Sequence, residues 1–185
     1  HTFKDQVIFE RAEIVKANGT PYAVFTPYKK AWLAKLNDFY MQSYPVAPYW
    51  KNLAPIQSAS LLPSLSALGF APNGLESLGV VGGMQAGAAR LADFVQRLHY
   101  YAARRDFPAM KGVSYLSVHL RFGTVSIREL VQLAAYQQDE GADTWLSELI
   151  WREFYQMLLW HHPRLVSQTY RPEYNQIAFP NDTQK

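Results

Sequence analysis

Trp145-Leu-Ser-Glu-Leu-Ile-Trp-Arg-Glu-Phe-Tyr155 is the stretch that decides the fold, and it lies within residues 142–163, which contain neither Gly nor Pro after Ala142 and before Pro163. Asp143 is a suitable N-cap, because its carboxylate can accept the free N–H groups of a first helical turn. At 100° per residue, most of the surface of the predicted helix is apolar. The apolar arc consists of Leu146, Leu149, Ile150, Phe154, Met157 and Leu158.

The opposite side of this predicted helix carries a narrow stripe of different chemistry. Glu148, Trp151, Arg152 and Tyr155 follow one another at i, i+3, i+4 and i+7, and Trp145 lies beside them. A face that only meets solvent would carry Lys, Glu and Gln, so the stripe suits a cleft that holds a flat aromatic or an anionic ligand. A core helix with one internal Glu–Arg ion pair explains the spacing equally well.

Composition limits the kind of protein. Of the 185 residues, 49% are hydrophobic and 18% are charged, so the chain can bury a sizeable core. The net charge of +3 permits a polyanionic partner without requiring one. The absence of Cys excludes disulfides, thiolate metal sites and a Cys nucleophile, and it suits the cytoplasmic protein that we expect. No apolar run approaches the roughly 20 residues of a membrane span.

Residues 1–43 begin with two short β-like runs, 6–10 and 22–25, on either side of an Asn18-Gly19 turn, which is typical of a hairpin. Thr26 and Pro27 then predict a helix over residues 27–43, with Thr26 as N-cap and Pro27 at the first helical position. One side of this helix would carry Trp32, Leu33, Leu36, Phe39 and Tyr40.

Residues 44–83 differ from the rest of the chain. Pro and Gly interrupt them repeatedly, and no helical or strand period persists. Several of their side chains are too apolar for a free linker, so we expect an ordered connector. These side chains are Tyr49, Trp50, Leu61, Leu62 and Phe70.

The next helix is expected over residues 84–103, because its apolar residues recur at helical spacing. The segment that follows, residues 101–128, offers candidates for phosphate binding. Its basic residues outnumber its single acid, Asp106, which predicts either a phosphate-facing surface or an ordinary basic surface. These basic residues are Arg104, Arg105, Lys111, Arg121 and Arg128.

Two pairs of residues around this basic segment have helix-start chemistry. Ser114 and Ser117, with nearby backbone N–H groups, could bind a phosphate at a helix N-terminus or simply act as caps. Ser126 and Glu129 predict a capping box for a further helix. His161 and His162 are adjacent and cannot face one metal on a helix, so we predict no metal site.

The stretch from Trp145 to Tyr155 closely resembles the signature helix of the DNA photolyase/cryptochrome family. Residues 19–32 and the pattern Arg90-Leu91-x-x-Phe94 are also similar to that family. The resemblance covers nearly all of the chain, whereas family members are considerably longer. It implies a mainly α fold and an internal fragment of a class I cyclobutane pyrimidine dimer photolyase.

The resemblance also implies a domain organisation. Residues 1–43 would be the end of the N-terminal α/β (antenna) domain and the first connector helix. Residues 44–83 would be the interdomain connector, and residues 84–185 the N-terminal part of the helical FAD-binding domain.

The function implied is light-driven repair, in which reduced FAD donates an electron to a pyrimidine dimer that is flipped out of the DNA. The implied partner is DNA with pyrimidine dimers, and the implied cofactors are FAD and an antenna pigment such as methenyltetrahydrofolate. We expect a monomer with no membrane partner, and a piece of this length that binds FAD weakly and does not repair DNA alone. A cryptochrome-type blue-light photoreceptor and a cofactor-free helical interaction module are the alternatives.

The resemblance assigns roles by motif position. Glu148 would hydrogen-bond the dimer bases and Trp151 would stack on them, which makes these two the catalytic residues. The expected DNA contacts are Arg105, Glu148, Trp151, Arg152 and Tyr155. The expected cofactor contacts are Tyr101, Val113, Ser114, Tyr115, Leu116, Ser117, Trp145 and Arg152.

Three positions depart from the family pattern. Val113 stands where Thr is frequent, which removes one hydroxyl from the phosphate segment. His119 stands where Pro or a small residue is common, and Phe179 stands where Trp is usual.

Overall fold

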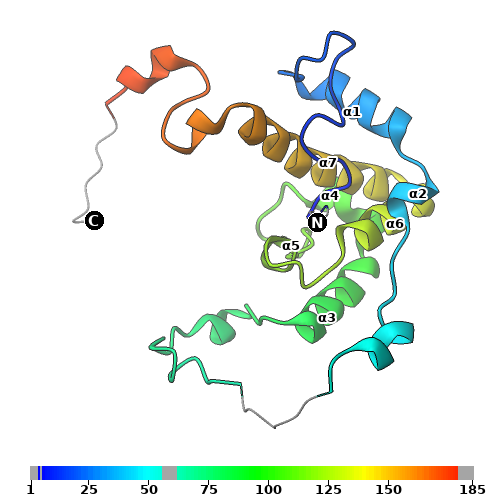
Figure 1. The fold of residues 1–185 in the computed structure, drawn as a ribbon, viewed down its shortest axis with the longest axis vertical. Coiled ribbons are helices and arrows are strands. Elements are labelled where there is room, and N and C mark those ends of the chain that lie inside the picture. The colour runs from blue at the N-terminus through cyan, green and yellow to red at the C-terminus, as the bar shows by residue number, and fades with distance from the viewer. Residues whose placement is uncertain (1–3, 5, 56–61, 179–185) are drawn as a thin grey trace.

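The computed structural model describes residues 4, 6–55 and 62–178, and these residues form helices and loops with no β-strand among them. Helix α7 (Glu140–His161) is the longest element and the centre of the fold, as Figure 1 shows. The helices α1 (Phe25–Lys35), α4 (Tyr101–Arg104) and α6 (Ile127–Gln137) all pack against it. The mainly α fold class predicted from the sequence is confirmed.

Helix α7 begins earlier than the sequence predicted. Its N-cap is Asp139, whose Oδ1 accepts a hydrogen bond from the backbone N–H of Ala142 at 2.7 Å. The prediction that Asp143 caps the helix is therefore wrong, because Asp139 already satisfies the first turn and Asp143 lies inside the helix. Gly141 is also inside it. A Cβ on Gly141 would lie 2.2 Å from the carbonyl oxygen of Leu98, so glycine permits the close approach of the preceding chain.

The N-terminal segment contains the predicted turn but not the predicted hairpin. The backbone N–H of Lys16 donates to the carbonyl of Thr20 at 2.9 Å, and Gly19 adopts a left-handed φ of 77°. The runs 6–10 and 22–25 do not form strands. In the first run, the N–H groups of Ile8 and Phe9 donate to the Glu153 carboxylate of α7 instead of to a neighbouring strand.

The helix expected over residues 27–43 is divided into α1 and α2 (Asp38–Met41). Helix α1 begins at Phe25 with Val24 as N-cap, so Thr26 and Pro27 lie within its first turn and Thr26 does not cap it. Extended backbone at Leu36 and Asn37 separates the two helices. The predicted apolar side is therefore broken. Its members differ in burial: Trp32 is 1% exposed, whereas Leu33 is 40% and Phe39 67% exposed.

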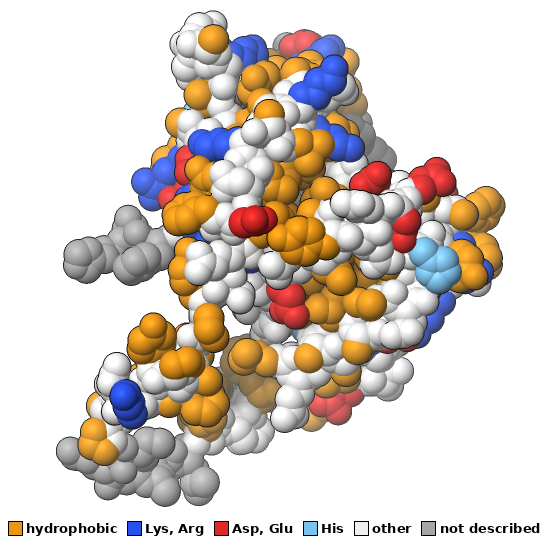
Figure 2. Space-filling model, turned by 90° about the vertical axis from the view of Figure 1, so that its right-hand side faces the viewer, with side chains coloured by type: hydrophobic (Ala, Val, Ile, Leu, Met, Phe, Trp, Pro, Cys, Tyr) orange, Lys and Arg blue, Asp and Glu red, His pale blue; other side chains and the backbone are white. Residues whose placement is uncertain are grey.

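The connector, residues 44–83, contains two 3₁₀ turns, η1 (Ala47–Asn52) and η2 (Leu75–Leu78), and runs apart from the main helices in Figure 1. Its large apolar side chains are not packed into a core. Trp50 is 64%, Phe70 63% and Leu62 93% exposed, and Tyr49 is similarly open. Leu61 lies outside the described residues. Figure 2 shows how many hydrophobic side chains lie at the surface on one face of the molecule.

The helix expected over residues 84–103 also proves to be several elements, namely α3 (Met84–Val95), the 3₁₀ turn η3 (Leu98–Tyr100) and α4. The break falls at Gln96 and Arg97, where Arg97 leaves the helical conformation. The short helix α5 (Ser117–Arg121) follows, and then α6. Helix α6 begins after Ser126 as predicted. The capping box is wrong, because the Ser126 side chain makes no cap hydrogen bond.

The core lies between α7 and the helices around it. Its fully buried members come from distant parts of the chain, which shows that α7 collects the rest of the fold. The largest of them are Ile8, Tyr28, Trp32, Phe94, Leu98, Leu116, Leu130, Val131 and Ile150. After α7 the chain continues through η4 (Pro163–Val166) and η5 (Pro172–Gln176). No helix in the described ranges is long and apolar enough to cross a membrane.

Candidate functional site

The predicted polar stripe of α7 meets α4 at Glu148. Its Oε1 accepts a hydrogen bond from Arg105 Nη1 at 2.5 Å, and the guanidinium of Arg105 lies 5.6 Å from the ring of Tyr101. The hydrogen bond to Glu148 raises the pKa of Arg105 above its ordinary value. The structure therefore brings together three of the predicted site residues from two helices. The salt bridge of Glu148 is made with Arg105 and not within α7.

Trp151, one turn further along α7, is half-buried between aromatic rings. Its indole stacks on Phe25 of α1, with ring centroids 3.6 Å apart and an interplanar angle of 8°. Tyr155 lies 5.5 Å away at 23° and is 61% exposed. A flat ligand that stacked on Trp151 would take the place of one of these two rings.

Arg152 points to the N-terminal segment. Its Nη1 donates to the carbonyl oxygen of Gln6 at 2.6 Å, and its Nη2 donates to the Gln6 side chain at 3.1 Å and to the carbonyl of Leu120 at 3.3 Å. Arg152, which was predicted to contact the cofactor and DNA, thus joins α7 to the segments around Gln6 and Leu120.

Glu153 is a residue that sequence reasoning missed. It is 2% exposed, and its carboxylate accepts hydrogen bonds from Ile8 N at 2.7 Å, Phe9 N at 3.0 Å and Trp32 Nε1 at 2.7 Å. Burial raises the pKa of the carboxyl from 4.5 to about 7, although these three donors act in the opposite direction. Its position in the sequence could have indicated a buried carboxylate, because Glu153 falls among Leu149, Ile150 and Met157 on the apolar arc.

Tyr101 and Trp145, both predicted to contact the cofactor, are buried around Phe94. The Phe94 ring lies 5.7 Å from Tyr101 and 4.8 Å from Trp145, edge-on in both cases. Burial raises the pKa of Tyr101. These side chains form part of the wall between α3, α4 and α7, with 7% exposure for Tyr101 and 2% for Trp145.

The predicted phosphate segment, residues 113–117, is anchored from the end of α3. Arg97 Nη1 donates to the carbonyl oxygens of Lys111 at 2.9 Å and of Val113 at 2.7 Å. Asp93 pairs with both Lys111 and Arg97, at 2.6 and 3.1 Å, and the hydrogen bond from Lys111 is the main cause that lowers the pKa of Asp93. A network of charged side chains thus fixes the approach to the segment.

Within the segment, backbone conformation separates the side chains. Tyr115 adopts a left-handed φ of 56°, which is uncommon for a residue with a Cβ. Leu116 is fully buried, whereas Tyr115 is 48% exposed. The hydroxyl of Ser114 accepts a hydrogen bond from Leu116 N at 3.4 Å. Tyr115 and Ser117 are the members of the segment that border open space.

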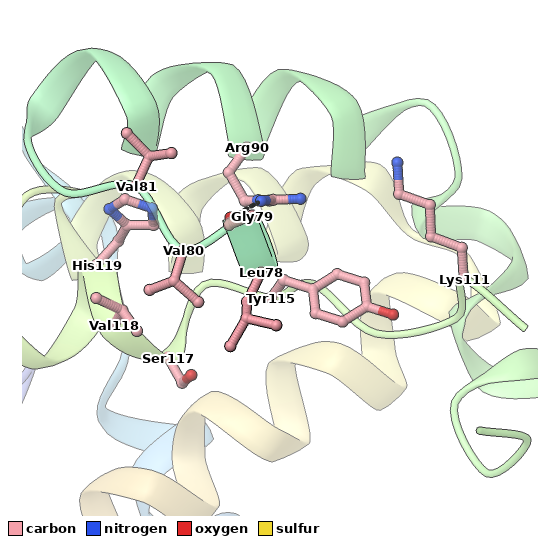
Figure 3. Close-up of a pocket in the computed structure, with 10 residues that line it drawn as sticks. All are labelled: Leu78, Gly79, Val80, Val81, Arg90, Lys111, Tyr115, Ser117, Val118 and His119. Atoms are coloured by element: carbon pink, nitrogen blue, oxygen red, sulfur yellow. Dashed lines mark hydrogen bonds between the residues drawn. The ribbon is translucent and has the colours of Figure 1, made fainter. Parts of the chain in front are cut away.

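That space is a cavity of about 410 Å³ between α3, α5 and the end of the connector. Figure 3 shows Tyr115 extending beside Arg90, with Lys111 at one end and His119 at the other. The lining residues include three cationic or imidazole side chains and no acid. They are Leu78, Gly79, Val80, Val81, Arg90, Lys111, Tyr115, Ser117, Val118 and His119. A concave, mostly apolar site with a few basic groups suits an anionic ligand.

Elsewhere in the part of the chain that the structure describes, no group of three or more His, Cys, Asp and Glu side chains could hold a metal ion. The predicted site residues therefore form two groups. One is the Arg105–Glu148 pair with Trp151 on α7, and the other is the cavity bordered by Tyr115 and Ser117.

No family model matches the chain, but individual known proteins do. It is 34% identical to the deoxyribodipyrimidine photo-lyase of Synechococcus sp. over 96% of its length, and 34% identical to that of Escherichia coli over 88%. The chain spans 39% and 35% of these two relatives.

The structure is also similar to that of a bacterial class III photolyase from Agrobacterium tumefaciens. The TM-score is 0.82 at 24% sequence identity, and the match covers 98% of this chain and 39% of the other. The structural match shows that the chain has the same fold as this class III photolyase. By sequence, the chain belongs to the DNA photolyase/cryptochrome family, and it spans about two fifths of the length of the relatives it matches.

Proposed function

We propose that this chain is part of a deoxyribodipyrimidine photolyase, a lyase that repairs cyclobutane pyrimidine dimers in DNA with light and FAD. The observation that carries the proposal is the grouping of Arg105, at the end of α4, with Glu148 and Trp151 of α7. It combines a guanidinium, a carboxylate and a half-buried indole in one place. The similarity to proteins named deoxyribodipyrimidine photo-lyase supports the same activity.

Each of the three side chains has a role in the proposal. The Glu148 carboxylate accepts hydrogen bonds from the N–H groups of the dimer bases, and Trp151 offers a face for stacking. Arg105, at the edge of the group, binds a DNA phosphate. Since Arg105 and Glu148 already neutralise each other, DNA would provide each of them with a new partner.

The donor set also fits a dinucleotide cofactor. Arg90, Lys111 and Ser117 at the cavity suit a diphosphate. FAD, when bound, would supply the electron that splits the dimer. The chain's own residues bind the anionic part, exclude water and hold the flipped bases. An antenna pigment such as methenyltetrahydrofolate, a monomeric state and a cytoplasmic location belong to the same proposal.

A chimera tests the function directly. The matching segment of the Synechococcus photolyase is replaced by this chain, and light-dependent repair of an oligonucleotide with one thymine dimer is measured. We expect repair by the chimera and loss of at least about tenfold in its Trp151→Ala variant, because stacking on one base contributes about 1–3 kcal/mol. Trp160→Ala is the matched control, since Trp160 is on the same helix and 55% exposed.

Three outcomes would contradict the proposal. A chimera that folds and binds FAD but repairs nothing would favour a photoreceptor. A chimera that folds without binding FAD would favour a helical interaction module. Equal repair by the Trp151→Ala and Trp160→Ala variants would remove the role given to Trp151.

A further inference from the structure

Phe25, the first residue of α1, covers one face of the Trp151 indole. The two ring centroids lie 3.6 Å apart and the ring planes are within 8° of parallel, so the rings are in van der Waals contact over their faces. Aromatic pairs usually prefer an offset or edge-on arrangement, so the surroundings must impose this one. No base can enter between two rings at this separation. A planar ligand on Trp151 must therefore use the other face of the indole.

The Phe25 ring is supported from behind by buried aromatic side chains. Phe154 of α7 lies edge-on to Phe25, with 5.8 Å between the centroids, and edge-on to Trp151 at 5.6 Å. Tyr28 of α1 packs against Phe154 in turn, at 5.1 Å. Phe154 and Tyr28 are 3% and 1% exposed. The stacked pair therefore rests on the core, which restricts the movement of both rings.

Helix α1 is also held against α7 by two side-chain hydrogen bonds. Lys29 Nζ donates to the hydroxyl of Ser147, and Trp32 Nε1 donates to the Glu153 carboxylate at 2.7 Å. These bonds fix the position of α1 on α7. The ring at the first position of α1 is consequently kept over Trp151.

Tyr155 is the other ring that stacks on Trp151, and it is held less firmly. Its centroid lies 5.5 Å from that of Trp151 at an angle of 23°, and its side chain is exposed. Within the described residues, its hydroxyl has no hydrogen-bond partner. Displacing Tyr155 should therefore cost less than displacing Phe25.

We propose that Phe25 is a positioning residue for Trp151 and a determinant of specificity for damaged DNA. Phe25 fixes the plane of the indole and closes one of its faces, so that a flipped pyrimidine stacks on the remaining face. Tyr155, rather than Phe25, is the neighbouring ring that gives way. The inference rests on the proposed function, because it takes the flipped bases as the ligand of Trp151.

Fluorine NMR of the 185-residue chain labelled with fluorotryptophan tests the ring contact without DNA. The chain has five Trp, and Trp151→Phe identifies the resonance of Trp151. Phe25→Leu keeps the apolar volume without a flat ring and should move that resonance, whereas Phe25→Tyr should leave it nearly in place. Phe39→Leu makes the same change at an exposed ring and is the matched control. A Trp151 resonance that Phe25→Leu does not move would overturn the contact.

The chimera with the Synechococcus photolyase tests the role in recognition. Its affinity in the dark is measured for an oligonucleotide with one thymine dimer and for the same oligonucleotide undamaged. Phe25→Leu should weaken binding of the damaged DNA about fivefold, as expected for the loss of one aromatic pair. Binding of undamaged DNA and the rate of repair at saturating damaged DNA should not change. Phe25→Tyr should restore the affinity, and Phe39→Leu should have no effect.

Thermal melting of each variant checks folding, and Phe25→Met replaces Phe25→Leu if the latter melts lower than the unmodified chimera. Equal weakening for damaged and undamaged DNA would show a general loss of structure and overturn the positioning role. Equal affinities of Phe25→Leu and Phe39→Leu for damaged DNA would also overturn it, and the proposed function would stand if the unmodified chimera repairs DNA. An unmodified chimera that folds and binds FAD but does not distinguish damaged from undamaged DNA would contradict the proposed function and this inference together.

Discussion

Helix α7 and the connector of residues 44–83 are both rich in large apolar side chains, but only α7 buries them. Leu149, Ile150 and Phe154 of α7 are at most 5% exposed, whereas Trp50 and Phe70 of the connector are 64% and 63% exposed. The difference is periodicity. A helical repeat collects apolar residues on one face that other elements can cover, and the connector has no such repeat. Apolar composition alone therefore does not predict burial.

The two regions also differ in the hydrogen bonds that link them to the rest of the chain. The buried carboxylate of Glu153 draws two backbone N–H groups and the indole of Trp32 onto α7 from distant positions along the chain. The connector instead receives a hydrogen bond from a side chain outside it, because Arg90 of α3 donates to the carbonyl of Gly79. Substitutions in the two regions should therefore differ strongly in their effect on stability.

The largest effect is expected for Glu153→Ala. It would leave the donors of Ile8, Phe9 and Trp32 buried without an acceptor, which should lower the free energy of unfolding by about 3–5 kcal/mol. Urea denaturation monitored by tryptophan fluorescence measures this. Glu129→Ala is the control, since Glu129 is exposed, and should cost less than about 0.5 kcal/mol. Similar losses in both variants would show that the buried carboxylate does not anchor the N-terminal segment.

Gly141→Ala should have the next largest effect. The new Cβ would meet the Leu98 carbonyl at 2.2 Å, so α7 and η3 must separate. We expect a loss of about 1–3 kcal/mol, as for other overpacked cores. Gly82→Ala in the connector is the matched control, because no atom lies within 4 Å of the place that its Cβ would take. If Gly141→Ala unfolded at the same denaturant concentration as Gly82→Ala, the close packing of α7 against η3 would be refuted.

A smaller effect should follow from pH. The pKa of Glu153 is higher in the folded protein, about 7, than its ordinary 4.5, so the folded protein binds more protons between these values. The free energy of unfolding should therefore decline as pH rises through this window, by at most about 1.4 kcal/mol per pH unit. Denaturation at about pH 5, 6 and 7 measures the slope, which Glu153→Gln should reduce.

Asp93 and Asp139 contribute to stability at a lower pH than Glu153 does. Hydrogen bonds lower the pKa values of Asp93 and Asp139 below the ordinary 3.8, so their stabilising contribution is complete above that pH and is lost only on further acidification. Identical slopes for the unmodified chain and Glu153→Gln across the window would show that Glu153 does not titrate there.

The smallest effect is expected in the connector. Trp50→Ala removes a large side chain that is 64% exposed, and the free energy of unfolding should change by less than about 0.5 kcal/mol. Trp32→Ala in α1 is the contrasting variant, since Trp32 is 1% exposed and bonded to Glu153, and should cost about 3–5 kcal/mol. A large loss for Trp50→Ala would mean that the connector packs in solution.

Regular spacing and local turn residues determined which parts of the fold could be predicted from the sequence. The helical repeat of apolar residues over α7 predicted the helix and its buried arc, and Asn18-Gly19 predicted the turn. The division of residues 27–43 at Leu36 and of residues 84–103 at Arg97 was not predicted, because neither Gly nor Pro marks either break. At the first break the Asn37 side chain, which accepts a hydrogen bond from Phe39 N, caps α2.

The same limit applies to the site. Helical spacing placed Glu148 and Trp151 on one face, but the partner of Glu148 is Arg105, which follows the end of α4 and lies 43 residues away along the chain. Glu153 was overlooked because an acid on an apolar arc makes sense only with its distant donors. Contacts between remote segments carry no signal in one sequence without a motif that links them.

Arg152 and Glu153 together have a consequence for how α7 recognises the N-terminal segment. Arg152 donates to a main-chain carbonyl at Gln6, and Glu153 accepts from main-chain N–H groups at Ile8 and Phe9. These bonds recognise backbone atoms and the direction in which they run, as a receptor recognises a peptide. A short peptide of the same polarity, supplied separately, should therefore be able to occupy this place on α7 whatever side chains it carries at its outward-facing positions.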